Sequence, residues 1–272
     1  MDHSIHLSVY SCRHCGFVQI PPILEEEYYD DYLMGTTHSL QMQAYQDSQA
    51  ERFVGEYGLE GKRVIEVGCG DGSFLDHLSA KGALVSGIEP SARFRTRALA
   101  RGHNVEEGYI SADRKLSGGA FDGFVTRQVL EHVPDIHGFL TGIRNNLAPG
   151  AVGLIEVPSL EKALKDQRYY DFFADHVNYF SLDTLRLAVE LNGFKVLEQY
   201  HDMYDEYNVV HVRVADRSDL SAVQATLFSL GSELHDLISN ASAQGKRVIM
   251  WGSGGKGLSV LAAAEFAMST NS

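Results

Sequence analysis

The residues with the clearest chemical character lie in a glycine-rich turn that follows an apolar run. This turn contains three glycines, Gly68, Gly70 and Gly72, and the acid Glu66 stands two residues before the first of them. Glycine lets the backbone approach a ligand closely, because no Cβ stands in the way. The dinucleotide fingerprint G-x-G-x-x-G requires glycine five residues after the first, but Ser73 occupies that position. The turn therefore argues against a nicotinamide cofactor, and the lack of a neighbouring lysine or arginine indicates a ligand without phosphates.

A histidine between an acid and an aromatic residue is the best candidate for acid–base chemistry. His176 has Asp175 directly before it and Tyr179 three residues after it. An unperturbed imidazole titrates at about pH 6.5, so it can accept a proton at neutral pH. Asp175 could orient the ring and stabilise its protonated form, and Tyr179 could line a pocket. The alternative is a structural hydrogen-bonding role for His176.

A cysteine pair near the N-terminus has metal-ligand spacing. Cys12 and Cys15 form a C-x-x-C unit, which is half of a structural zinc site. His3 and His6 are the candidates to complete it, and the alternative is a knuckle without a metal. The third cysteine, Cys69, lies within the glycine-rich turn, where a small packed side chain is more typical than a nucleophile. Three cysteines do not make a disulfide scaffold.

Strands and helices alternate from residue 62 onward. The expected strands span 62–67, 83–88, 104–110, 121–127, 151–157, 194–199 and 209–215. The expected helices span 73–80, 91–101, 136–147, 181–192 and 218–243. This alternation predicts an α/β fold with a doubly wound sheet of seven strands, the last antiparallel, and helices on both faces. Such sheets bind ligands at the carboxyl ends of their strands, where the glycine-rich turn and Glu89 are expected.

Composition, together with the pattern of expected strands and helices, divides the chain into four parts. These are a zinc-knuckle-like segment at 1–24, a polar helical segment at 25–60, the α/β core at 61–216, and a long helix with the start of a second Rossmann-like unit at 217–272. The second unit would open with a strand at 246–251. Few residues follow that strand, so we expect the C-terminal α/β segment to be truncated.

The core resembles class I S-adenosylmethionine (SAM) methyltransferases. Its glycine-rich turn is similar to motif I of that family, which packs against the methionine portion of SAM. Glu89 stands where the family binds the ribose hydroxyls. The resemblance implies a SAM site formed by Glu66, Gly68, Cys69, Gly70, Gly72, Glu89, Pro90, Gln128 and Tyr32.

More specifically, the chain resembles sugar C-methyltransferases, which methylate a nucleotide-linked 4-keto sugar at C3. The similar segments are the Cys12–Cys15 knuckle, a tyrosine-rich stretch at 29–32, the Asp-His-x-x-Tyr-Phe-Ser run at 175–181 and the glycine-rich stretch at 245–257. The resemblance implies that His176 removes the C3 proton. The sequence departs from the family at Phe173, where tyrosine is usual, at Asp175, where glutamate is usual, and at 208–214, where a His-Gly-Gly-Ser motif is usual.

Two other functions fit the same residues. An O-methyltransferase acting on a glycan or a secondary metabolite would use His176 to deprotonate a hydroxyl. A non-catalytic SAM-binding protein would keep the glycine-rich turn and Glu89, and only turnover with an acceptor distinguishes it from an enzyme.

Charge and hydropathy argue against several classes of partner. The 272 residues carry a formal net charge of −13, which argues against a nucleic-acid backbone or an anionic membrane. No apolar run approaches the roughly 18 residues of a membrane span, and no signal-peptide pattern opens the chain. We expect a cytoplasmic protein that acts on a small-molecule acceptor, such as a sugar nucleotide or a glycan precursor; no oligomeric state is predicted.

Overall fold

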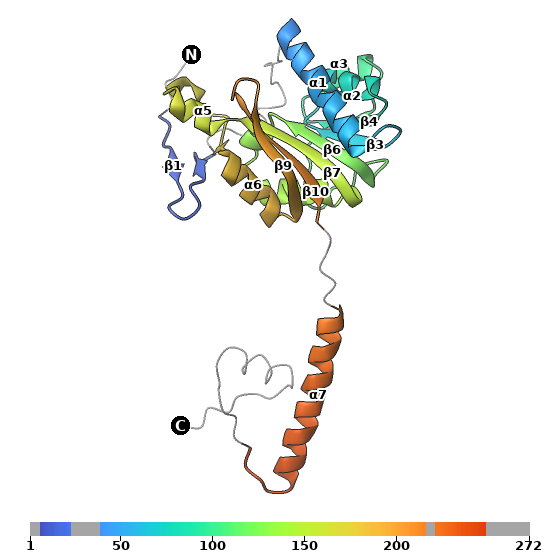
Figure 1. Ribbon diagram of the computed structural model, residues 1–272, viewed down its shortest axis with the longest axis vertical. Helices are drawn as coiled ribbons and strands as arrows, with labels where there is room; N and C mark the ends of the chain where they lie inside the picture. The colour runs from blue at the N-terminus through green and yellow to red at the C-terminus, as the bar shows by residue number, and fades with distance from the viewer. Residues whose placement is uncertain (1–5, 23–38, 216–220, 249–272) are drawn as a thin grey trace. The chain divides into compact units, whose positions relative to one another are not determined.

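The computed structural model describes residues 6–22, 39–215 and 221–248 (Figure 1). Contacts divide the chain into two units, residues 1–216 and 217–272, and each is described by itself. The strands are β1 (Tyr10–Ser11), β2 (Val18–Gln19), β3 (Arg63–Val67), β4 (Leu84–Glu89), β5 (Val105–Glu107), β6 (Phe121–Arg127), β7 (Leu147–Pro158), β8 (Asn178–Tyr179), β9 (Phe194–Asp202) and β10 (Tyr207–Val214). The helices are α1 (Leu40–Tyr57), α2 (Ser73–Ala80), α3 (Ala92–Ala100), α4 (Ile136–Arg144), α5 (Leu160–Lys165), α6 (Leu182–Leu191) and α7 (Ser221–Ala243), with 3₁₀ turns η2 (Leu130–His132) and η3 (Tyr169–Asp171).

The main sheet has seven strands in the order β5-β4-β3-β6-β7-β10-β9. Strands β3 to β7 run parallel to one another, and β10 runs antiparallel to both β7 and β9. The short link at 203–206 explains why β9 and β10 are antiparallel, because a tight hairpin can join only antiparallel strands. The expected doubly wound α/β sheet with an antiparallel last strand is confirmed.

Helices cover both faces of this sheet. On one face α1 packs on the sheet through Phe53, which shares a buried cluster with Val64 of β3. On the other face α4 and α6 contribute Leu140 and Leu185 to a cluster with Phe124 of β6. The central strands therefore read as nearly continuous apolar runs, as expected where both faces are buried.

A second, three-stranded sheet joins the N-terminal segment to the His176 region. Strand β2 pairs with β1 on one side and with β8 on the other, in the order β1-β2-β8. The N–H of Ile20 also donates to the carbonyl of Val177 at 3.0 Å. The hairpin that carries the cysteine pair thus braces the strand that follows His176.

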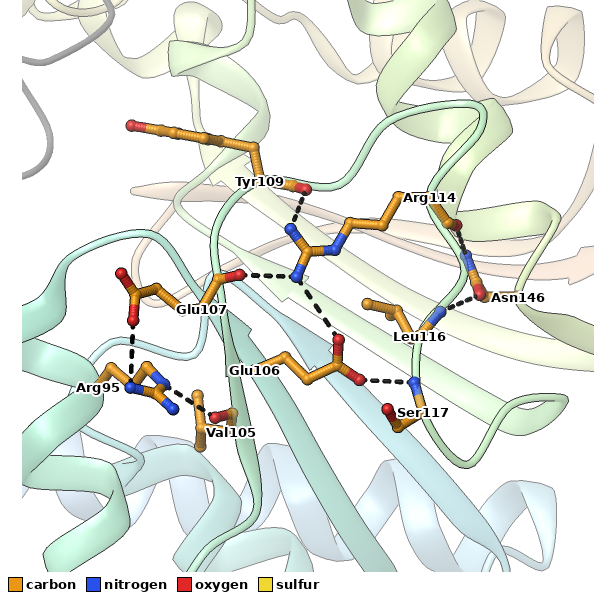
Figure 2. Close-up of polar contacts among 9 residues, drawn as sticks. All are labelled: Arg95, Val105, Glu106, Glu107, Tyr109, Arg114, Leu116, Ser117 and Asn146. Atoms are coloured by element: carbon orange, nitrogen blue, oxygen red, sulfur yellow. Dashed lines mark hydrogen bonds and ion pairs between the residues drawn. The ribbon is translucent and has the colours of Figure 1, made fainter.

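The edge strand β5 is fixed by polar contacts with the loop that follows it (Figure 2). The Arg114 guanidinium donates to the carbonyls of Glu107 and Tyr109 at 2.6 and 3.2 Å. The buried Asn146 side chain accepts from the N–H of Leu116 and donates to the carbonyl of Arg114, both at 2.8 Å. These bonds satisfy backbone groups that the loop would otherwise leave unpaired.

Several expected boundaries shift. The expected helix at 136–147 ends at Arg144, and the strand expected from residue 151 begins at Leu147, because the chain after Asn146 already pairs with Phe121 of β6. The expected strand at 104–110 ends at Glu107, where Gly108 turns the chain with a φ of 110°.

Two further expectations concern residues 246–251 and 25–60. Of the strand expected at 246–251, residues 246–248 lie outside any strand, and the rest falls outside the described residues. The helical segment expected at 25–60 is observed as α1, and residues 25–38 fall outside the described part. Among the described residues, no helix is both long and apolar enough to cross a bilayer.

Candidate active site

The glycine-rich turn joins the end of β3 to the start of α2. Gly68, Gly70 and Gly72 have φ angles of 76°, 53° and 80°, in the left-handed region that favours glycine. A Cβ on Gly68 would lie 2.4 Å from Cγ2 of Val129, so the turn packs directly on the segment after β6. Backbone conformation and close packing therefore both require glycine at position 68.

Glu89, the last residue of β4, contacts this turn through its carboxylate. Its Oε2 accepts from the N–H of Gly70 and its Oε1 from the N–H of Ser91, each at 2.9 Å. Burial raises the pKa of Glu89 above its usual value. Each carboxylate oxygen has a further lone pair, so Glu89 can still accept hydrogen bonds from hydroxyl groups of a ligand. Pro90 follows directly at the same edge of the sheet.

Glu66 is a buried acid just before the glycine-rich turn. Burial raises its pKa to about 8, although the positive charge of Arg127 opposes the shift. Its Oε2 has no hydrogen-bond partner among the described residues. A buried carboxyl oxygen without a partner is costly, so its position indicates a donor supplied by a ligand.

Cys69 contributes packing and backbone to the turn. A Cβ on Gly87 of β4 would lie 2.5 Å from its Sγ, so the thiol fills the space that Gly87 leaves. Burial raises the pKa of this thiol well above its usual value. The protonated thiol is a poor nucleophile, which agrees with a packing role.

Glu156 of β7 ties helix α1 to this edge of the sheet. Its buried carboxylate accepts from Tyr45 (2.5 Å), Gln49 (2.7 Å), Arg127 (2.9 Å) and Gln128 (3.1 Å). The backbone N–H of Gln128 also donates to the carbonyl of Glu156 at 2.9 Å. These two bonds hold Gln128 at a φ of 55°, a conformation that residues other than glycine rarely adopt. Gln128, predicted to bind the cofactor, thus directs its side-chain amide to Glu156.

Two histidines meet at the same edge. The rings of His132 and His176 make an edge-on contact with their centroids 4.6 Å apart. Burial and the neighbouring His132 lower the pKa of His176 to about 3. The His176 imidazole is therefore neutral at neutral pH and keeps a lone pair.

Asp175 contacts His132 on the side of Nδ1. The Nδ1 atom lies 2.9 Å from the Asp175 carbonyl oxygen and 3.7 Å from its Oδ2. Asp175, His132 and His176 therefore lie next to one another at this edge.

Tyr179 and Asn178 fix the backbone around His176. The Tyr179 hydroxyl accepts from the N–H of Phe173 at 2.9 Å and lies 3.2 Å from the Phe173 carbonyl. The hydroxyl therefore hydrogen-bonds to the backbone of the loop that precedes His176. The Phe173 ring packs 4.9 Å from the His176 ring, centroid to centroid. The buried Asn178 amide donates to the carbonyls of Leu130 and Val133, at 3.1 and 2.7 Å, and so attaches the His176 segment to η2.

The cysteine pair forms a tight knuckle. The N–H of Gly16 donates to the Cys12 carbonyl at 2.9 Å, and the Cys12 N–H to the Phe17 carbonyl at 2.8 Å. Hydrogen bonds from Cys15 and His14 lower the pKa of the Cys12 thiol, which suits a metal-binding thiolate. Within residues 6–22, 39–215 and 221–248, no third ligand atom gathers with the two thiols. His3 lies outside the described residues, as does Tyr32, which was predicted to contact the cofactor.

Sequence reasoning missed Glu131, Glu156 and Tyr45. Glu156 interrupts an apolar strand, and a charged residue inside such a run signals a buried polar network. Glu131, directly before His132, is 2 % exposed, and burial raises its pKa to about 8. No local signal identifies Tyr45, because its partner lies in a distant strand.

Comparison with known proteins decides the family. Residues 41–199 match the model of a methyltransferase domain, which is more than half of the chain. The chain belongs to this methyltransferase family. The C-methyltransferase NovU of Streptomyces niveus is 26 % identical over 287 aligned residues, which cover 94 % of this chain and 68 % of NovU. A ubiquinone biosynthesis O-methyltransferase of Rhizobium leguminosarum bv. trifolii is 32 % identical over 124 residues, 44 % of this chain and 48 % of that protein.

Solved structures of methyltransferases share the fold. Magnesium protoporphyrin IX methyltransferase from Synechocystis PCC 6803 with bound SAH superposes with a TM-score of 0.53 at 18 % identity, over 68 % of this chain and 91 % of that one. An S-adenosylmethionine-dependent methyltransferase from Clostridium acetobutylicum ATCC 824 gives 0.53 at 11 % identity, over 64 % and 92 %. The methyltransferase described here therefore has the class I SAM-dependent fold, and it is an enzyme of that type.

The residues at the sheet edge fit SAM. The left-handed glycines leave room for a ligand against the backbone, Glu89 retains acceptor capacity for hydroxyls, and Glu66 has an unpartnered oxygen for a donor. When bound, SAM supplies an activated methyl group.

Proposed function

We propose that this methyltransferase transfers the methyl group of SAM to carbon 3 of a nucleotide-linked 4-keto sugar, with His176 as the general base. Residues 61–216 would form the catalytic core. The cofactor site would consist of the glycine-rich turn, Glu66, Glu89 with Pro90, and Gln128. The observation that carries the proposal is the neutral, buried His176 in contact with the His132–Asp175 pair.

The arrangement suits removal of a proton from carbon. The lone pair of His176 takes the C3 proton, and the electrons of the broken C–H bond form the enolate of the 4-keto group. Burial and His132 disfavour the protonated His176 ring, and the Asp175 carboxylate, which lies 3.7 Å from Nδ1 of His132, would offset part of this cost, since opposite charges attract more strongly away from bulk water. The enolate carbon is then the nucleophile for the methyl group, so no covalent enzyme intermediate is needed.

The relationship to NovU, named a C-methyltransferase, supports carbon as the methylated atom, because that alignment includes 94 % of the chain. The alternative is an O-methyltransferase acting on a glycan or a secondary metabolite. It is supported by the ubiquinone biosynthesis O-methyltransferases, which share higher identity over a shorter segment. In that case His176 would deprotonate a hydroxyl.

Calorimetric titration tests the cofactor first. We expect S-adenosylhomocysteine to bind the purified, ligand-stripped protein and NAD not to bind. Failure of both ligands to bind would count against the assigned cofactor site and against a SAM-binding protein of any kind.

Isotope exchange tests the base. With S-adenosylhomocysteine bound and no methyl donor, the protein in D₂O should exchange the C3 hydrogen of a nucleotide-linked 4-keto sugar. His176→Gln should abolish this exchange while leaving S-adenosylhomocysteine affinity unchanged. Exchange that persists in the variant refutes the base assignment. A protein that methylates only hydroxyl acceptors supports the alternative.

The knuckle would hold zinc. We propose that Cys12 and Cys15 supply two thiolate ligands and that His3 and His6 supply the others. Metal analysis of the purified protein should find more zinc than in Cys12→Ser, by the amount that the knuckle holds. Equal zinc content in protein and variant would refute this site.

A further inference from the structure

Glu131 adds a carboxylate to the histidine pair. One oxygen of Glu131, one ring nitrogen of His132 and one of His176 all lie within 4.8 Å of one another. Oε1 of Glu131 lies 3.9 Å from Nε2 of His132. Two imidazoles and one carboxylate are a ligand set that binds Zn²⁺ and related divalent transition metals. Ligand atoms around such an ion lie about 3.3 Å apart, so small side-chain movements would close the site.

The Glu131 carboxylate is buried without a full set of partners. The residue is 2 % exposed, and its Oε2 has no hydrogen-bond partner among the described residues. Burial of an unpaired carboxyl oxygen is unfavourable unless a ligand or a cation compensates. Glu131 therefore points to a ligand independently of the spacing of the three groups.

The contacts of His132 set its ring for metal binding. A carbonyl oxygen accepts hydrogen bonds only, so Nδ1, which lies 2.9 Å from the Asp175 carbonyl, carries the ring proton. In the neutral ring the lone pair is then on Nε2, on the side of Glu131. A histidine ligand held through its other nitrogen by a carbonyl is the usual arrangement around protein-bound metals.

In a second cluster of acidic and histidine side chains, an arginine already takes the place that a cation would fill. Glu56, Glu198 and His211 also lie within 4.8 Å of one another. There Arg52 pairs with both carboxylates, at 3.2 Å for Glu56 and closer for Glu198. Both ring nitrogens of His211 contact tyrosine hydroxyls. A guanidinium already neutralises that cluster, whereas no arginine or lysine contact is found for Glu131 among the described residues.

We propose that Glu131, His132 and His176 form a binding site for a divalent transition-metal ion, and that the bound ion inhibits methyl transfer. The inhibition rests on the proposed function, because the ion would occupy the lone pair that His176 needs as a base. Three protein ligands leave at least one position for water or for an oxygen of the acceptor.

Cobalt is the probe for binding, since Co²⁺ replaces Zn²⁺ and absorbs visible light. Titration of the metal-stripped Cys12→Ser/Cys15→Ser protein should give one equivalent of Co²⁺ with visible bands and without sulfur-to-cobalt charge transfer. Glu131→Gln and His132→Asn should lower the cobalt affinity at least about ten-fold, the effect of removing a good ligand. Glu198→Gln in the second cluster is the matched control and should leave it unchanged.

S-adenosylhomocysteine affinity reports whether each variant is folded. If the double cysteine variant does not fold, the same titration in the unsubstituted protein remains decisive, because thiolate-bound cobalt shows charge-transfer bands and nitrogen–oxygen sites do not. Absence of the second, sulfur-free site refutes the proposal. Equal affinity in Glu131→Gln also refutes it.

Turnover tests the inhibition separately. Zn²⁺ should reduce methyl transfer by the metal-stripped protein, and EDTA should restore it. The ratio of rates with and without Zn²⁺ should approach one in Glu131→Gln. Stimulation by Zn²⁺ would overturn the inhibitory role. Failure of the metal-free protein to methylate its acceptor, with cobalt binding intact, would refute the proposed function and not the metal site.

Discussion

The backbone N–H of Gly70 donates a 2.9 Å hydrogen bond to Oε2 of Glu89. This bond joins the glycine-rich turn after β3 to the last residue of β4, so one carboxylate both shapes the turn and offers acceptors to a ligand. We therefore expect the conformation of the turn and its affinity for the cofactor to be linked through this side chain.

Replacing Glu89 tests this link. Glu89→Gln places an amide NH₂ group where an acceptor is needed, and removes the charge that favours bonds to hydroxyls. We expect the dissociation constant of S-adenosylhomocysteine to rise about 10- to 100-fold, as for loss of one or two charge-assisted bonds. Calorimetry measures it. Glu190→Gln, at an exposed pair on α6, is the control and should bind normally. Unchanged affinity in Glu89→Gln would contradict the assignment.

Gly68→Ala separates backbone strain from steric conflict. Gly58 has a φ of 62° and open space around it, so Gly58→Ala should cost only about 1 kcal/mol of unfolding free energy. Gly68→Ala adds the conflict with Val129 and should cost about 1–3 kcal/mol more. Val129→Ala in the Gly68→Ala background should recover most of this difference in urea denaturation. Equal losses of unfolding free energy in Gly58→Ala and Gly68→Ala would show that the close approach to Val129 does not affect stability.

Removing Glu156 should destabilise the protein more than removing one of its donors. Glu156→Ala leaves the buried Arg127 guanidinium without its carboxylate, so we expect a loss of about 3–5 kcal/mol in unfolding free energy. Tyr45→Phe removes the bond to Glu156 and the bond that Gln49 donates to the Tyr45 hydroxyl, and should cost about 1–2 kcal/mol. Urea denaturation measures both variants. Similar small losses would indicate that water replaces the carboxylate.

His211 should make stability depend on pH. Burial, with the positive charge of Arg52, lowers its pKa to about 4, although Glu198 opposes the shift. The unfolded chain, in which histidine titrates at about 6.5, therefore binds the proton more readily. This contribution to stability is complete above pH 6.5 and is lost as the pH falls towards 4, up to about 3 kcal/mol.

The matched variant His211→Gln should flatten that part of the profile. Denaturation at several pH values between 4 and 7 provides the comparison between the two proteins. The groups around the ring are the hydroxyls of Tyr57 and Tyr200 and the charges of Arg52, Glu56 and Glu198. A slope that is the same in both proteins would assign the pH dependence to other groups.

The sequence by itself determined the sheet and the glycine-rich turn. Apolar runs of strand length alternating with amphipathic helices leave few ways to bury both faces of a sheet. The left-handed angles at Gly68, Gly70 and Gly72 follow from residue type, since glycine alone adopts them without strain. The position of Glu89 at a strand end could be predicted because Pro90, directly after it, ends the strand.

Only the tertiary structure decided which side chains meet. Tyr45 and Glu156 are 111 positions apart, and His132 and Asp175 are 43 apart, so their contacts depend on strand order and helix placement. The sequence placed Asp175 beside His176 because they are neighbours in the chain, and the fold adds His132, whose Nδ1 lies 3.7 Å from Oδ2 of Asp175. Local periodicity fixes which face of an element is buried, whereas partners within the site are set by long-range packing, which no short pattern encodes.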